Sequence, residues 1–155
     1  MRTIEIQVFK FDELNDRAKE RARDWWRSTD HYGWDEDSRH SISTFCSHFG
    51  VKLKEYDVDN CWFKHDASND TFRGRKLKDF KRDHMPTGYC LDCALWETFY
   101  DEFKRTTSAA IAFDNALRAG LREWRDDRDH QNTDEYIDEV LIANEYEFTE
   151  EGKKV

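Results

Sequence analysis

Large aromatic side chains supply much of the apolar material from which this chain must build a core. The 155 residues include 11 Phe, 6 Trp and 6 Tyr, and these aromatic residues make up 15% of the sequence. Charged residues make up 38% and hydrophobic residues 37%, a balance that would favour disorder if the apolar side chains were small. Because each ring buries a large area, a modest number of rings suffices for a core. The composition therefore predicts a folded protein with a heavily charged surface.

Hydrophobic periodicity predicts both strands and helices. Alternating patterns predict strands at residues 4–11, 51–58, 61–66 and 146–149. Helical spacing predicts one helix that ends near residue 28, helices at residues 35–49 and 75–84, and three more that carry Leu91 to Phe103, Phe113 to Trp124 and Ile137 to Leu141. Asp12 or Asn15 is expected to cap the first of these helices, and Asn132 with Glu135 the last.

These elements predict a single α+β domain over residues 1–155. The simplest arrangement is a small, mostly antiparallel sheet of about four strands that packs against several helices. The strands at the two ends of the chain are expected to be neighbours. The helices around Leu95 and Leu117 are expected to form an antiparallel hairpin, because only a short connection separates them.

The chain carries no obvious membrane or secretion signal. It has no run of 18 apolar residues, and Met1-Arg2-Thr3-Ile4-Glu5 contains no apolar stretch of signal-peptide length. We therefore expect a cytoplasmic protein. In the cytoplasm its cysteines should be thiols or metal ligands rather than disulfides; they are Cys46, Cys61, Cys90 and Cys93.

The sequence Cys90-Leu91-Asp92-Cys93 is a C-x-x-C motif with three interpretations. Its thiolates can share a zinc ion, with Cys61 and His65 as further ligands; Cys46 with His48, or His84, are other candidates. The two thiols can also form a redox pair at a helix start, or serve as small core hydrophobes. The common nucleotide-binding, hydrolase and metalloprotease motifs are absent, so catalysis is less strongly indicated than binding.

Negative charge is concentrated at the end of the chain. The formal net charge is −9, and residues 123–155 carry 12 acidic and 4 basic side chains. One interpretation is a solvated surface that keeps the protein soluble. The functional interpretation is a docking surface that imitates nucleic-acid phosphates toward a basic partner. Its candidate residues are Asp126, Asp127, Asp129, Asp134, Glu135 and Asp138, with Trp34 and Trp62 as aromatic anchors.

A basic segment at residues 73–82 supports an alternative function. Its cations are Arg73, Arg75, Lys76, Lys78, Lys81 and Arg82. Such a cluster can bind phosphates directly, as in a nucleic-acid-binding regulator or an antitoxin. The acidic charge elsewhere in the chain argues against this alternative.

Both ends of the chain resemble a known group of proteins. Residues 11–22, Phe-Asp-Glu-Leu-Asn-Asp-Arg-Ala-Lys-Glu-Arg-Ala, and residues 142–153, Ile-Ala-Asn-Glu-Tyr-Glu-Phe-Thr-Glu-Glu-Gly-Lys, resemble a family of small uncharacterised proteins from tailed bacteriophages. Members commonly carry W-x-Q-G-D-G after the second strand, of which only Trp62 and Asp66 are present here. The resemblance implies a phage origin and expression in a bacterial cytoplasm. Some members carry an antitoxin-like label, and the resemblance implies no catalytic residue.

Together these observations lead to ranked functional hypotheses. The first is a non-enzymatic phage accessory protein that binds a host or defence protein complex, for example as an inhibitor of a CRISPR effector. The second is a nucleic-acid-binding regulator or antitoxin that uses residues 73–82. The third is a zinc- or thiol-dependent enzyme built on Cys90 and Cys93. No membrane partner is expected.

Overall fold

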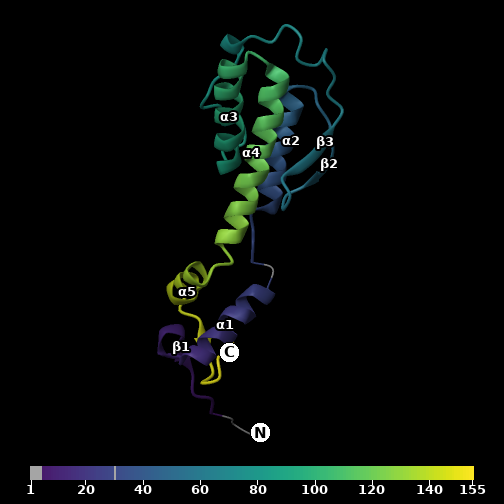
Figure 1. The fold of residues 1–155 in the computed structure, drawn as a ribbon. Helices are drawn as coiled ribbons and strands as arrows, with labels where there is room; N and C mark the ends of the chain where they lie inside the picture. The colour runs from purple at the N-terminus through teal and green to yellow at the C-terminus, as the bar shows by residue number, and fades with distance from the viewer. Residues whose placement is uncertain (1–4, 30) are drawn as a thin grey trace. The chain divides into compact units, whose positions relative to one another are not determined.

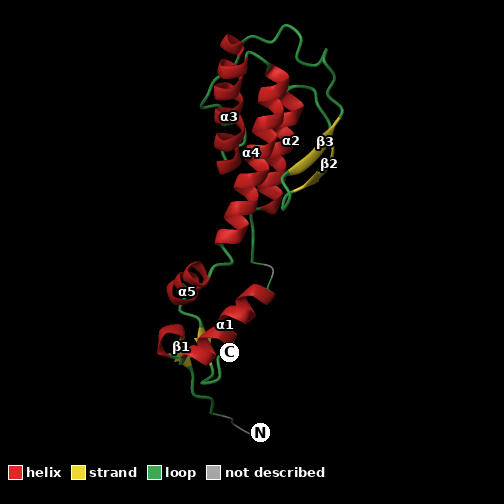
Figure 2. Cartoon of the chain, in the orientation of Figure 1, coloured by secondary structure: helices red, strands yellow, loops and turns green. Residues whose placement is uncertain are grey.

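The computed structural model describes residues 5–29 and 31–155 and shows an α+β fold (Figures 1 and 2). In chain order the elements are β1 (Phe9–Lys10), a 3-10 turn (Phe11–Glu13), α1 (Asp16–Ser28), α2 (Asp35–His48), β2 (Leu53–Asp57), β3 (Trp62–His65), a 3-10 turn (Leu77–Asp79), α3 (Cys90–Thr106), α4 (Ala109–His130), α5 (Asp134–Ala143) and β4 (Glu147–Phe148). The predicted fold class is confirmed. Among the described residues the four strands form two separate antiparallel pairs rather than one sheet.

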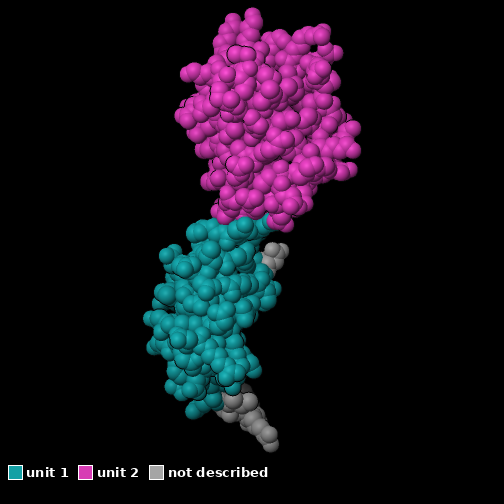
Figure 3. Space-filling view, in the orientation of Figure 1, with its two compact units in different colours: residues 1–33, 128–155 teal, residues 34–127 magenta. Residues whose placement is uncertain are grey.

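The chain divides into two compact units, coloured separately in Figure 3. The terminal unit comprises residues 1–33 and 128–155, and the helical unit comprises residues 34–127. The single domain expected from the sequence stays a prediction, which one shared unfolding transition would confirm. No helix in the described part of the chain is both long enough and apolar enough to cross a membrane.

Aromatic rings from three helices fill the core of the helical unit. The Phe45 ring of α2 stacks on the Phe113 ring of α4, with 5.2 Å between ring centroids. Phe49 lies 4.9 Å from Phe99 of α3, and Trp96 of α3 packs edge-on against Phe45 at 5.0 Å. All five side chains are buried. Because such ring pairs are stabilising beyond their buried area, the few large side chains of this charged sequence are enough for a core.

The predicted hairpin of α3 and α4 is confirmed: the two helices pack antiparallel. Leu95 and Gly120 lie at their contact. A Cβ added to Gly120 would lie 2.6 Å from Cδ2 of Leu95, so the missing side chain makes room for the Leu95 side chain. The first turn of α4 follows Thr107, which adopts a left-handed conformation and ends α3.

The β2–β3 hairpin presents one face to α4. Tyr56 pairs with Phe63 across the strands, and the Tyr56 ring lies 6.1 Å from the Trp124 ring of α4. The guanidinium of Arg118, also on α4, lies 5.4 Å from the Phe63 ring. Because successive side chains of a strand point to opposite faces, Trp62 lies on the face directed away from α4.

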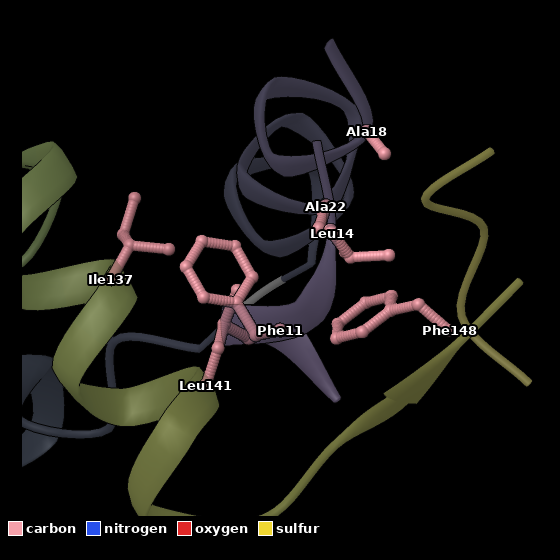
Figure 4. Close-up of a cluster of buried hydrophobic side chains, with 7 residues drawn as sticks. All are labelled: Phe11, Leu14, Ala18, Ala22, Ile137, Leu141 and Phe148. Carbon is pink, nitrogen blue, oxygen red and sulfur yellow. The ribbon is translucent and has the colours of Figure 1, made fainter. Parts of the chain in front are cut away.

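The terminal unit has its own core, shown in Figure 4. Its buried side chains come from both ends of the sequence: Phe11, Leu14, Ala18, Ala22, Ile137, Leu141 and Phe148. α1 begins at a cap formed by Asn15, whose Oδ1 accepts from the Ala18 amide at 3.0 Å. β1 pairs antiparallel with β4, which confirms that the terminal strands are neighbours.

Three predicted elements differ from the structure. The first strand is limited to Phe9–Lys10; residue 4 lies outside the described residues, and residues 5–8 form no regular structure. The predicted helix at residues 75–84 is wrong, because only a 3-10 turn at Leu77–Asp79 forms. There the Phe80 ring stacks on Phe49 at 5.6 Å, and this tertiary contact outweighs the local helical spacing. α5 is capped by Thr133 rather than Asn132.

Candidate functional site

Arginines of α1 bind two of the predicted docking carboxylates inside the terminal unit. The Arg23 guanidinium donates twice to Asp138, from Nε to Oδ1 and from Nη2 to Oδ2, both at 2.7 Å. Arg27 donates to Asp134, and Arg23 approaches the same carboxylate at 3.5 Å. Hydrogen bonding to Asp138 raises the pKa of Arg23. Asp134 and Asp138 therefore hold α5 against α1, and their charge is neutralised there.

Carboxylates at the end of α4 are also engaged. Arg125 donates to Asp126 at 2.7 Å from Nη2, and its Nη1 lies 3.5 Å from the Cys61 sulfur. Asp127, the next residue, has an interaction partner as well. Both residues belong to the helical unit, so the acidic segment predicted as one surface is divided between two units.

The outward face of α5 carries two carboxylates that have no ion-pair partner among the described residues. Ile137 and Leu141 are fully buried, which fixes the rotation of the helix. At 100° per residue, Glu135, Glu139 and Ile142 then lie on the opposite side. Both glutamates are exposed, neither has an ion-pair partner among the described residues, and Ile142 is 51% exposed. We call these three residues the α5 strip.

The two glutamates of the α5 strip repel each other, and a basic binding partner would offset this repulsion. Glu135 and Glu139 are spaced four residues apart, where like charges on a helix repel. Asp129 on α4 is also exposed and makes no ion pair within the described chain. Of the predicted acidic set, Asp129 and Glu135 are thus the members available to a partner. Glu139 and Ile142 were missed in the prediction, although the positions of Ile137 and Leu141 already placed them on the outer face.

The two predicted aromatic anchors are exposed but lie in the helical unit. Trp34 precedes α2 and is 51% exposed, and Trp62 begins β3 and is 50% exposed. Removal of apolar area from water is favourable, so a protein partner that covers the exposed half of such a ring would gain binding free energy. The structure therefore places the predicted anchors on a different unit from the α5 strip.

The basic segment is an irregular loop whose arginines are largely engaged. Arg73 pairs with Asp70 at 2.7 Å, and Arg82 pairs with Asp101 at 3.2 Å. The Arg75 guanidinium lies 5.8 Å from the Phe49 ring. The cations without a partner in the described structure are Lys76, Lys78 and Lys81. The potential that this segment offers to phosphates is therefore weaker than its composition suggests.

The predicted zinc ligands are not brought together. The described residues contain no group of three or more His, Cys, Asp or Glu side chains that could hold a metal ion. The Cys61 sulfur accepts from Arg125. Nδ1 of His65 accepts from the Ala67 amide at 3.2 Å, so Nε2 carries the hydrogen and donates to Asp114 at 2.8 Å. With both ring nitrogens occupied, His65 braces the β2–β3 hairpin against α4.

The C-x-x-C cysteines lie at the start of α3, and both are exposed. Burial raises the pKa of the Cys93 thiol, and the charges of Glu97 and Cys90 add to this effect. A catalytic redox cysteine instead needs a lowered pKa, because the thiolate is the reactive form. The Cys93 sulfur lies 3.5 Å from the Met85 sulfur.

We predict that the buried thiol of Cys46 makes stability decrease at alkaline pH. Burial, with a contribution from Asp66, raises its pKa from 9.0 to about 12. Between those pH values the folded state binds more protons than the unfolded state, so the free energy of unfolding falls as pH rises, by up to about 1.4 kcal/mol per pH unit. Urea denaturation of the wild type and of Cys46→Ala at several pH values in this range measures the decline in the free energy of unfolding. The variant should show a shallower decline, and equal slopes would contradict the assignment.

No protein-family model, curated protein or solved structure matches this chain. The phage resemblance of its two ends therefore stays a prediction.

Proposed function

We propose that this protein acts by binding another protein, and that the α5 strip docks on a basic surface of that partner. The proposal rests on one observation, the distribution of paired and unpaired carboxylates around α5 among the described residues. Asp134 and Asp138 are neutralised by Arg23 and Arg27, whereas Glu135 and Glu139 project outward without a partner in the described structure.

This arrangement suits recognition for two reasons. The Arg23–Asp138 pair and the buried Ile137 and Leu141 hold α5 in place, so little ordering free energy is lost when a partner binds. Complementary charge speeds association and selects the partner, while the exposed Ile142 adds apolar area beside the charges. Trp34 and Trp62 offer a second contact surface on the helical unit.

The partner class follows from the charge. A basic protein surface is typical of proteins that bind nucleic acid, and a host or defence complex such as a CRISPR effector has this character. We propose that the α5 strip occupies such a surface and competes with the nucleic acid for it. The resemblance to phage proteins agrees with this role. The basic loop at residues 73–82 supports direct nucleic-acid binding less well, because Arg73 and Arg82 are paired.

We predict that reversing the charge of the α5 strip abolishes capture of a basic partner. The double variant Glu135→Lys with Glu139→Lys should weaken binding by about tenfold or more, because it replaces attraction by repulsion. Capture from defence-carrying bacterial cells identifies the partner, and titration of the purified pair measures the loss. Glu147→Lys with Glu150→Lys is the matched control, with the same change in charge at two exposed residues of the same unit.

Two results would contradict this proposal. Equal binding by the α5 variant and the control variant would show that net charge, rather than the α5 strip, attracts the partner. Capture of no basic protein by the wild-type chain would remove the proposed partner class. A mobility shift with nucleic acid alone that weakens with salt, and that Lys76→Ala with Lys78→Ala abolishes, would favour the basic loop instead.

A further inference from the structure

Two sulfur atoms are in contact where α3 begins, and a third sulfur-bearing side chain lies one helical turn away. The Met85 Sδ lies 3.5 Å from the Cys93 Sγ. Cys90 is three residues before Cys93 on the same helix, a spacing at which helical side chains are neighbours. All three residues are exposed. We call Met85, Cys90 and Cys93 the sulfur cluster.

Hydrogen bonds to the buried Asp92 side chain hold the loop that carries Met85 onto α3. Oδ2 of Asp92 accepts from the Thr87 amide at 2.8 Å and from the Gly88 amide at 2.9 Å. The ring of His84, next to Met85, packs edge-on against Trp96 at 4.6 Å. The chain on both sides of Met85 is therefore anchored to the helix that carries the two cysteines. The thioether is positioned by the fold, and less ordering is required when a ligand binds.

We propose that the sulfur cluster binds one copper(I) ion. Thiolate and thioether sulfurs are soft ligands, which suit copper(I), zinc and iron–sulfur clusters. Iron–sulfur clusters need about four cysteine thiolates, more than this cluster offers. Zinc favours four ligands, usually thiolates, imidazoles or carboxylates, and the described residues bring no three such groups together. Two thiolates and one thioether give copper(I) a three-coordinate site.

The charge balance fits this position in the fold. Each cysteine releases one proton to water when its sulfur binds the ion, and the oxidation state of copper does not change. The site then carries two thiolate charges and one copper charge, which sum to a net charge of −1. This negative charge lies in the first turn of α3, where unpaired backbone amides give the helix a partial positive charge.

The test is an anaerobic titration of the full-length, reduced protein with copper(I), in competition with a coloured copper(I) chelator. The expected result is one ion per chain and a thiolate-to-copper charge-transfer band in the ultraviolet. Met85→Leu keeps the size of the side chain and removes the thioether, so it should weaken binding by about tenfold or more. Cys93→Ser should weaken it further. Cys61→Ser is the matched control, because it removes a thiol outside the cluster and should leave the affinity unchanged.

Circular dichroism of each variant separates loss of the site from loss of the fold. Folded Met85→Leu that binds copper(I) as tightly as wild type would overturn the proposal, because the thioether would then not be a ligand. Failure of the wild-type protein to compete with the chelator would overturn it as well. So would zinc that displaces copper(I) from the same cysteines.

Discussion

Asp92→Ala is expected to lower the free energy of unfolding by about 3 kcal/mol, because it removes the buried acceptor that ties a loop to the start of α3. The Asp92 side chain is completely buried. Its Oδ2 accepts from the Thr87 and Gly88 amides and from the Thr87 hydroxyl, the last at 2.9 Å. The alanine variant removes this acceptor from the partly buried Thr87 donors, and each buried donor left unsatisfied has a desolvation cost of about 1–3 kcal/mol. The Gly88 amide belongs to an exposed residue and can bond to water instead. Urea denaturation followed by tryptophan fluorescence measures the change.

Two companion variants separate the causes of this loss. Asp92→Asn keeps an acceptor oxygen at nearly the same place, so it should be less destabilising than Asp92→Ala. Asp101→Ala removes a carboxylate of the same helix that pairs with Arg82 at the surface, and should change stability by no more than about 0.5 kcal/mol. An alanine variant at position 92 as stable as the one at position 101 would show that the buried network does not hold the loop.

Gly152→Ala is expected to destabilise the terminal unit by about 3 kcal/mol or more. Gly152 has a φ of +83°, and a Cβ at this position would lie 2.1 Å from the Ala18 carbonyl oxygen and 2.8 Å from its carbonyl carbon. These are backbone atoms of α1, so they can retreat only if the helix moves. Two effects therefore add: the left-handed backbone disfavours a side chain, and the chain near its C-terminus has no space for one.

Gly74→Ala separates these two effects. Gly74 has a similar φ of +77°, but beyond its chain neighbours no heavy atom lies within 4 Å of the place that a Cβ would occupy. It should show the conformational cost alone, about 1 kcal/mol. Thermal unfolding of both variants gives the difference, and hydrogen exchange of α1 reports whether the helix has moved. Equal losses in the two variants would mean that residues near 152 do not pack closely on Ala18.

Local patterns predicted most of the helices. The spacing of Phe45 and Phe49, or of Leu95 and Phe99, is set by the 3.6-residue turn of the α-helix, and the helices that carry these pairs formed where expected. The helix predicted at residues 75–84 failed because Phe80 packs against Phe49 and Phe99. Such ring contacts form between residues far apart in the chain, so no local window contains them.

The candidate site was predicted less completely than the fold, for the same physical reason. The excess of carboxylates in residues 123–155 was visible in the sequence. Their neutralisation was not, because Arg23 and Asp138 are 115 positions apart and meet only after α1 and α5 pack together. The zinc ligands were likewise inferred from spacing, whereas the structure brings Met85 rather than Cys61 to Cys93.

The sequence by itself determined the helical hairpin and the location of the net negative charge, because these depend on periodicity, a short connection and composition. The pairing of the terminal strands was expected, but it forms only through the tertiary structure, because β1 and β4 lie at opposite ends of the chain. Only the tertiary structure decided which charges are neutralised within the molecule and which face outward. Hydrogen bonds form only within about 3 Å, and the Coulomb attraction of exposed charges is screened beyond about 8 Å in physiological salt. The packing of distant segments therefore determines that Asp138 braces α5 while Glu139 remains available to a partner.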